Sequence, residues 1–351
     1  MPLPLPYRKI LTDLKTTNGT PRRVVPILLL LILGLTLAAC GGGTSTGGGE
    51  DTEQKETTEA VASVGRYVLP GEEVYPEGIA YDPRTGNFFV GSTTDGTIFR
   101  GNVGVDQGEA EVFLDPGSDG RQVATGMKVD KTGRLFISGG NTGRIFVYDT
   151  ASEGLIRAFD TPESRMTFIN DVAVTPNGDA YFTDSMRPIL FRVPAAPDGL
   201  GELEDWLDFE GTPVKYGEGI NLNGIVPTED GQYLITVQSN TGKLYRIDTG
   251  SKEVTEIDLG GETLTNGDGL LLDGQTLYVV RNQQGLIVPV ELLEDFASGE
   301  VGESFSDPSF HYPTTIAQYD GRLLVVNSQF DRRQSGQEPE LPFTVSSIEI
   351  P

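Results

Sequence analysis

A polar residue followed by a strand-like apolar stretch recurs six times in this chain, and this repeat limits the fold more than any other feature. The intervals between the first residues of successive copies are 48, 45, 53, 45 and 46 residues. The six copies begin at Glu77, Thr125, Asn170, Asn223, Asp268 and Thr314. A repeat of this length that holds about four short strands is typical of one propeller blade. The sequence therefore predicts an all-β protein, a six-bladed β-propeller with four-stranded blades, over residues 65–351.

The two ends of the repeat region predict how the ring closes. The last copy has strand-like runs near Thr314, near Leu323 and at 343–350, and it is one strand short. An unpaired strand-like run at 66–69 precedes the first copy. Because each blade must pack between two neighbours, we expect this N-terminal strand, at about 66–69, to complete the last blade. A pair of packed β-sheets is the alternative fold, which the even spacing of the copies disfavours.

The residues before the repeats resemble an export and lipidation signal. Residues 1–23 are basic, residues 24–39 are mainly apolar, and Leu37-Ala38-Ala39-Cys40-Gly41 is similar to a bacterial lipobox. We expect residues 1–39 to be a lipoprotein signal peptide and Cys40 to carry the lipid. Residues 40–64 comprise this cysteine and a linker rich in Gly, Ser, Thr and Glu, a composition typical of flexible segments.

This signal predicts the location of the protein. It would be exported and anchored by its lipid to the outside of the bacterial cell membrane, or in the periplasm of a cell with two membranes. The alternative is an uncleaved anchor in which the cysteine is incidental.

Composition excludes several classes of function. The chain has one histidine, His311, and one cysteine, so it cannot build a metal centre from several imidazoles or thiolates. The formal net charge of −25 disfavours binding to nucleic acid. We expect a monomer that acts on a small molecule. We interpret His311 as a loop residue and Trp206 as a packing residue within a blade.

The polar residues that open the repeats predict a metal site. The first strand of each propeller blade lines the central channel, so these residues should meet at one mouth of the channel. Carboxylate and amide oxygens suit a hard cation such as Ca²⁺, with Mg²⁺, Mn²⁺ or Zn²⁺ as alternatives. The expected ligands are Glu77, Asn170, Asn223 and Asp268. The alternative interpretation is that the Asn-Gly and Asp-Gly pairs are ordinary turn dipeptides.

The same residues carry a resemblance to a known family. Over about residues 65–351 the repeats resemble the regucalcin/gluconolactonase (senescence marker protein-like) family of six-bladed propellers. The matching motifs are Glu77-Gly78, Asn170-Asp171, Asn223-Gly224 and Asp268-Gly269, in family order and in the matching blades. The resemblance implies that Glu77, Asn223 and Asp268 hold one divalent cation. It also implies that Asn170 is a ligand or contacts substrate or water, and that Asp268 is the catalytic general base.

Two positions depart from the family pattern. Members that act on sugar lactones carry arginine two residues before the blade-three asparagine, where this chain has Phe168. We therefore expect a more apolar lactone or ester as substrate. Related phosphotriesterase propellers hold a second, structural Ca²⁺ through a histidine and an aspartate; the matching position here is Leu271, so we expect one ion. Thr125 and Thr314, which open the other two blades, join Phe168 as expected residues of the substrate pocket.

These features predict a membrane-anchored, Ca²⁺-dependent hydrolase of a lactone or ester. Water would be activated at a metal in the central channel, where Asp268 would accept its proton. The alternative is a non-catalytic propeller at the cell surface that binds a small ligand or a protein partner, because propellers serve both purposes.

Overall fold

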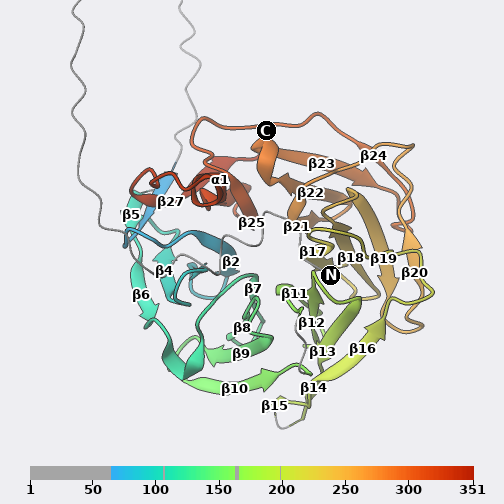
Figure 1. The fold of residues 1–351 in the computed structure, drawn as a ribbon, viewed down its shortest axis with the longest axis horizontal. Coiled ribbons are helices and arrows are strands. Elements are labelled where there is room, and N and C mark those ends of the chain that lie inside the picture. The colour runs from blue at the N-terminus through green and yellow to red at the C-terminus, as the bar shows by residue number, and fades with distance from the viewer. Residues whose placement is uncertain (1–64, 106, 163–165, 198) are drawn as a thin grey trace, which may run out of the picture. The chain divides into compact units, whose positions relative to one another are not determined.

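The computed structural model describes residues 65–351, apart from 106, 163–165 and 198. The predicted signal peptide (1–39), the lipidated Cys40 and the linker (40–64) lie outside the described residues. The described chain forms six sheets arranged radially as blades, with the first strand of each blade innermost, and a separate two-stranded hairpin (Figure 1). The prediction of an all-β, six-bladed propeller is confirmed.

The blades follow one another along the chain. Blade 1 contains β2 (Pro76–Asp82), β3 (Asn87–Ser92), β4 (Ile98–Asn102) and β6 (Glu111–Leu114). Blade 2 contains β7 (Met127–Val129), β8 (Arg134–Ser138), β9 (Arg144–Asp149) and β10 (Leu155–Asp160). Blade 3 contains β11 (Ile169–Val174), β12 (Ala180–Asp184), β13 (Ile189–Val193) and β16 (Glu204–Asp208).

The second half of the ring repeats this order. Blade 4 contains β17 (Leu222–Pro227), β18 (Tyr233–Gln238), β19 (Lys243–Asp248) and β20 (Val254–Glu256). Blade 5 contains β21 (Gly267–Asp273), β22 (Thr276–Arg281), β23 (Leu286–Leu292) and β24 (Gly299–Val301). Blade 6 contains β25 (Pro313–Tyr319), β26 (Arg322–Asn327), β27 (Phe343–Glu349), β1 (Gly65–Leu69) and β5 (Gln107–Glu109).

Short elements connect these strands. They are the hairpin β14 (Ala195–Ala196) and β15 (Gly199–Leu200), the 3₁₀ turns η2 (Ser118–Gly120) and η3 (Asn282–Gln284), and the helix α1 (Phe330–Ser335). Among the described residues, no helix reaches the length and hydropathy that crossing a bilayer requires.

The N-terminal strand closes the ring, as the sequence predicts. β1 pairs antiparallel with β27 from Gly65 opposite Ser347 to Leu69 opposite Phe343. The prediction of four strands in every blade needs one addition, because β5 pairs in parallel with the other edge of β1. β5 comes from the connection between β4 and β6 of blade 1, so blade 6 has five strands and β1 is not an edge strand.

Apolar clusters between neighbouring blades hold the ring together. In each first strand, successive side chains point to opposite faces of the sheet, and both faces are covered by adjacent blades. Ile79 of β2 packs into the cluster shared with blade 6, whereas Ala80 packs into the cluster shared with blade 2. Trp206 is buried and meets the ring of Tyr181 edge-on, with the two centroids 4.9 Å apart. It therefore packs within blade 3.

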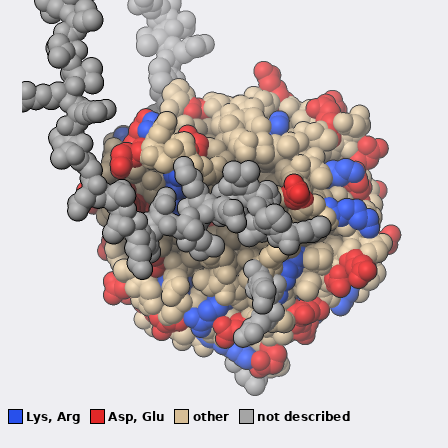
Figure 2. Space-filling model, viewed as in Figure 1, with Lys and Arg blue, Asp and Glu red and all other residues tan. Residues whose placement is uncertain are grey.

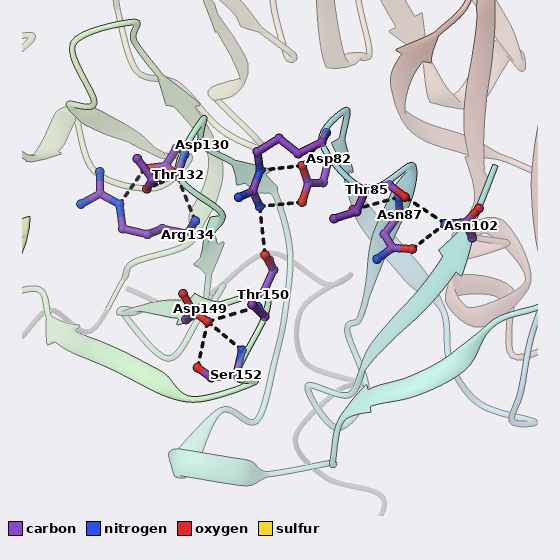
Figure 3. A network of polar contacts seen from close by, with 12 residues as sticks. Asp82, Thr85, Asn87, Asn102, Asp130, Thr132, Arg134, Asp149, Thr150 and Ser152 are labelled. Carbon is purple, nitrogen blue, oxygen red and sulfur yellow. Dashed lines mark hydrogen bonds and ion pairs between the residues drawn. The ribbon is translucent and has the colours of Figure 1, made fainter. Parts of the chain in front are cut away.

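Polar turns link the blades at the far ends of the first strands (Figure 3). The buried carboxylate of Asp82 accepts hydrogen bonds from Nε and Nη2 of Arg84 at 2.9 and 2.7 Å. Nη2 of Arg84 also donates to the hydroxyl of Thr150 in blade 2, at 3.2 Å. Asp130 and Arg134 repeat the pairing in blade 2. These turns fix the C-terminal ends of β2 and β7, and the site residues lie toward the opposite ends of the inner strands.

Candidate active site

The N-terminal ends of the six inner strands meet at one mouth of the channel. The backbone N–H of Gly126 donates to the carbonyl of Asn170 in the next blade at 2.8 Å. The hydroxyl of Thr314 donates to the carbonyl of Glu77 at 2.9 Å, which joins blade 6 to blade 1. The predicted ligands are all buried in this ring: Glu77, Asn170, Asn223 and Asp268.

Glycine at the second position of the repeat is required by close approach of neighbouring blades. An added Cβ at Gly78 would lie 2.1 Å from the carbonyl oxygen of Thr125, and one at Gly224 would lie 2.2 Å from that of Asp268. None of these glycines has a left-handed backbone conformation. The alternative interpretation of Asn223-Gly224 and Asp268-Gly269 as turn dipeptides is therefore wrong, because the pairs lie within strands β17 and β21.

Two serines orient the two asparagines. Nδ2 of Asn170 donates to Oγ of Ser185 at 2.8 Å, and Oγ of Ser185 donates its only proton to the carbonyl of Leu222 at 2.7 Å. Nδ2 of Asn223 donates in the same way to Oγ of Ser239 at 3.1 Å. Because each serine proton is committed to a backbone carbonyl, the serines can only accept from the amides. Each amide nitrogen thus faces its serine, which leaves the amide oxygen available on the other side.

Two carboxyl groups share the site with these amides. Glu77 is 8% exposed, and its Oε2 has no hydrogen-bond partner among the described residues. Burial raises the pKa of Glu77 well above its usual range, and the charges of Asp268 and Asp171 add to this. Burial likewise raises the pKa of Asp268 to about 7, opposed by hydrogen bonds from Asn282 and Asn223. The charges of these two carboxyl groups therefore act on each other within the site.

A third buried carboxylate, Asp171, was not among the predicted site residues. It occupies the position that glycine holds in four other blades, and its Oδ2 accepts a hydrogen bond from the N–H of Ile225 at 3.1 Å. Burial raises its pKa, while the charge of Lys128 and two backbone N–H groups oppose the shift. The sequence did contain a signal for Asp171, since an aspartate stands here at a repeat position that is glycine in four other blades.

The donor set fits a hard divalent cation. A buried carboxylate oxygen without a partner, a second carboxylate and two oriented amide oxygens are the ligand types that Ca²⁺ prefers. Among the described residues, no three His, Cys, Asp or Glu side chains are gathered closely enough to hold a metal by themselves. The amide oxygens of Asn170 and Asn223 would therefore be needed to complete a set with Glu77 and Asp268.

The three predicted pocket residues take different places. The hydroxyl of Thr125 donates to the carbonyls of Ile169 and Ser138, at 2.9 and 3.1 Å, so it links blades. The hydroxyl of Thr314 bonds the backbone of blade 1, as described above. Both hydroxyls thus join adjacent strands, and their contact with substrate stays a prediction. Phe168 is partly exposed, and its ring lies beside Gly140, where Val123 forms a second apolar contact.

Tyr312 lies on the blade 6 side of the mouth and was missed in the sequence. It is partly buried, and burial raises its pKa to about 12, with the charge of Asp268 adding to the shift. Its neighbour His311 is 44% exposed at the side chain, and its Nδ1 lies 3.5 Å from Oε2 of Glu340. The chain's single histidine is therefore part of an exposed pair on the blade 6 insertion, consistent with a loop residue.

The opposite ends of the inner strands of blades 2 to 5 line a separate, open cavity of about 510 Å³. Its walls include Val129, Val174 and Leu272, and its rim includes Asp130, Lys131 and Glu229. Asp130 is engaged by Arg134, and Nζ of Lys131 donates to the carbonyl of Pro176 at 2.9 Å. The predicted ligands do not line this cavity.

The surface of the propeller carries charges of both signs. On the face shown in Figure 2, acidic side chains are spread around the periphery of the molecule, with basic side chains between them.

Comparison with known proteins defines the class of fold. Neither a family model nor a curated sequence matches the chain. Solved structures with the same fold include the Malassezia sympodialis allergen Mala s 1, at 15% identity and TM-score 0.60, covering 81% of this chain and 96% of that one. They include regucalcin, a calcium-binding protein from Agrobacterium tumefaciens, at 17% identity and TM-score 0.56, covering 81% and 95%. A virginiamycin B lyase from Staphylococcus aureus with quinupristin has 17% identity and TM-score 0.55, covering 76% and 82%.

The chain is thus a propeller with the fold of regucalcin. The resemblance indicated by the sequence is confirmed for the fold. It is not extended to an activity, because all these identities are far below those at which an activity carries over from one protein to another.

Proposed function

We propose that this protein is a Ca²⁺-dependent hydrolase of lactones or esters that acts at the mouth of the propeller channel. The observation that carries the proposal is the unpartnered, buried Oε2 of Glu77 beside Asp268. Two buried carboxylates without a counter-charge destabilise a protein, so their retention favours a cation-binding role. The regucalcin neighbour, described as calcium-binding, has the same fold and supports Ca²⁺ as the ion.

The proposed chemistry assigns a task to each side chain. When bound, Ca²⁺ would act as a Lewis acid toward the oxygen of the scissile carbonyl. Glu77, Asn170 and Asn223 would supply its oxygen ligands, and Asp268 would be a ligand and general base. Asp268 takes a proton from water as the water oxygen attacks the carbonyl carbon. The proton then passes to the leaving alkoxide as the ester C–O bond breaks.

The apolar corner at the mouth supports an apolar substrate. Phe168 and Val123 are partly exposed beside Gly140 between blades 2 and 3. An acyl or aromatic group covers such a surface better than a sugar hydroxyl does, because the ring of Phe168 and the side chain of Val123 are apolar. We therefore propose an acyl or aromatic lactone or ester in place of a sugar lactone.

A substrate panel tests this function. The chain from residue 41 onward is assayed against gluconolactone, acyl lactones, aryl esters and phosphotriesters, with Ca²⁺ and with EDTA. We expect Ca²⁺-dependent hydrolysis, fastest for acyl or aromatic lactones and esters, that Asp268→Ala lowers by at least about 100-fold. Turnover that is the same in EDTA, or unchanged in Asp268→Ala, would refute the proposal. Fastest cleavage of gluconolactone would refute the apolar substrate alone.

A non-catalytic role is the second candidate. Its support is that one fold can serve binding as well as catalysis, and the far cavity of about 510 Å³ leaves room for a ligand. Ca²⁺ binding without turnover of any substrate in the panel would favour this alternative.

We also propose that the protein is exported as a monomeric lipoprotein. The support is the lipobox-like segment ending at Cys40 in the sequence. Metabolic labelling with an alkyne fatty acid should label the wild-type chain and leave Cys40→Ala unlabelled, with Cys40→Ala retained at the size of the uncleaved precursor. Equal labelling of the two chains would contradict lipidation at this residue.

A further inference from the structure

One repeat position lies directly behind the ring of site residues. It is the residue that follows the second strand in five blades, and the corresponding residue of blade 2 is Gly140. The residues at this position in blades 1, 3, 4, 5 and 6 are Thr93, Ser185, Ser239, Asn282 and Ser328. Four are hydroxyl residues, and blade 5 alone carries an amide.

All four hydroxyls donate to backbone carbonyls. Thr93 donates to the carbonyl of Tyr75 at 2.7 Å, and Ser328 donates to that of Tyr312 at 2.8 Å. Ser185 and Ser239 donate to carbonyls of the next blade, those of Leu222 and Gly267. A hydroxyl at this position therefore has no proton left for a site side chain, and it can only accept.

An acceptor suits blades 3 and 4, where the site residue is an asparagine whose nitrogen donates. In blade 5 the site residue is Asp268, a carboxylate that needs a donor. Asn282 supplies it, because its Nδ2 donates to Oδ2 of Asp268 at 2.7 Å. Oδ1 of Asn282 accepts the N–H of Gln283 at 2.6 Å, so the amide cannot turn its oxygen toward Asp268 without losing this bond.

We propose that Asn282 is a positioning residue that orients the Asp268 carboxylate for cation binding and for its role as a base. This inference rests on the proposed function. Asn282 engages Oδ2, and Asn223 gives a second hydrogen bond to the same carboxylate, so the bond from Asn282 restricts how the carboxylate can turn toward the cation or the attacking water. In blades 3 and 4 a serine bonds a site asparagine, whereas in blade 5 an asparagine, Asn282, bonds a site aspartate, Asp268. The donor and the acceptor are thus exchanged together in blade 5. Loss of a hydrogen bond that orients a metal ligand typically lowers metal affinity by about 10- to 100-fold.

The test compares three variants of the full chain, purified in detergent. Asn282→Ala removes the donor, and Asn282→Ser introduces the hydroxyl residue found in the other blades. Gln284→Ala, on the same 3₁₀ turn and exposed, is the matched control. Ca²⁺ affinity is measured by isothermal titration calorimetry, and folding is checked by circular dichroism and thermal melting in EDTA.

We expect both Asn282 variants to bind Ca²⁺ about 10- to 100-fold more weakly than the wild type, with Gln284→Ala unchanged. Asn282→Ser should not recover affinity, because its proton goes to a backbone carbonyl. Recovery by serine, or wild-type affinity in Asn282→Ala, would overturn the inference. A purely structural role predicts that serine rescues.

A second measurement separates this inference from the proposed function. If the wild-type chain binds no Ca²⁺, the proposed function fails, and crystal structures of the metal-free wild type and Asn282→Ala then decide the inference. We expect the Asp268 carboxylate to rotate away from its wild-type orientation in Asn282→Ala. An unchanged orientation would overturn the positioning role.

Discussion

The carboxylate of Asp171 accepts a hydrogen bond from the backbone N–H of Ile225 in the next blade, at 3.1 Å. In four other blades a glycine at the same repeat position lets neighbouring strands approach directly. Blade 3 instead uses a side chain to join blade 4, and this places a third negative charge near Glu77 and Asp268. Asp171 therefore has a structural contact and an electrostatic effect that substitution can separate.

Asp171→Asn should keep the contact and remove the charge. An amide oxygen can still accept the N–H of Ile225, so we expect a folded protein with a thermal midpoint in EDTA no lower than that of the wild type. Ca²⁺ affinity should fall by a few-fold, because one nearby negative charge is lost. Calorimetry checks the affinity. Unfolding of the variant would show that the ionised carboxylate itself is required for the bridge.

Glu77→Gln should make the metal-free protein more stable and abolish stabilisation by Ca²⁺. The buried carboxylate lacks a partner, and a neutral amide removes that penalty, by about 1–2 kcal/mol. The wild type should gain thermal stability in Ca²⁺ by mass action, whereas the variant should not. Thermal melts with Ca²⁺ and with EDTA measure both effects. Glu229→Gln, at an exposed residue, is the control and should respond to Ca²⁺ as the wild type does.

In EDTA the wild-type protein should lose stability as the pH rises from about 4.5 to 7. The folded-state pKa of Asp268 is raised to about 7, above its ordinary value near 4, so the folded state holds this proton more tightly than the unfolded state. The proton-linked stability is present at low pH and is lost as the pH approaches 7. Asp268→Asn should have a flatter profile, and equal slopes for the two proteins would contradict this origin.

Gly224→Ala should destabilise the ring even though alanine is small. Its Cβ would lie 2.2 Å from the carbonyl oxygen of Asp268, and this overlap forces two inner strands apart, at a cost of about 1–3 kcal/mol or more. Gly250→Ala is the matched control, since its added carbon meets only the Asp248 side chain at 3.4 Å. Urea unfolding should show a lower midpoint for Gly224→Ala alone. Equal midpoints would mean that the strands adjust without strain.

The repeat made the architecture and the ring of polar residues predictable from the sequence. Six copies with even spacing indicate which residues occupy equivalent positions on the inner strands. Glu77 and Asp268 are equivalent in this way, so the repeat predicts that both lie at the same mouth of the channel. Asn282 was not predictable in this way, because its partner depends on the pairing of β21 with β22, which the repeat of the first strand does not reveal. β5 was also missed, since three residues in a connection have no apolar pattern and pair only because β1 lies beside them. Thr125 and Thr314 were placed in the correct ring, but their hydroxyls face backbone carbonyls.

The strand β1 has a mechanical consequence for an anchored protein. The segment that would carry the lipid precedes Gly65, the first residue of this strand, so a pull on that segment would reach the propeller through β1. Since β1 is paired on both edges, with β27 and with β5, such a load would be divided between two rows of hydrogen bonds. The expected attachment point and the seam of the ring would thus coincide, and tension on the lipid-bearing segment would be borne by a strand that has a partner on each side.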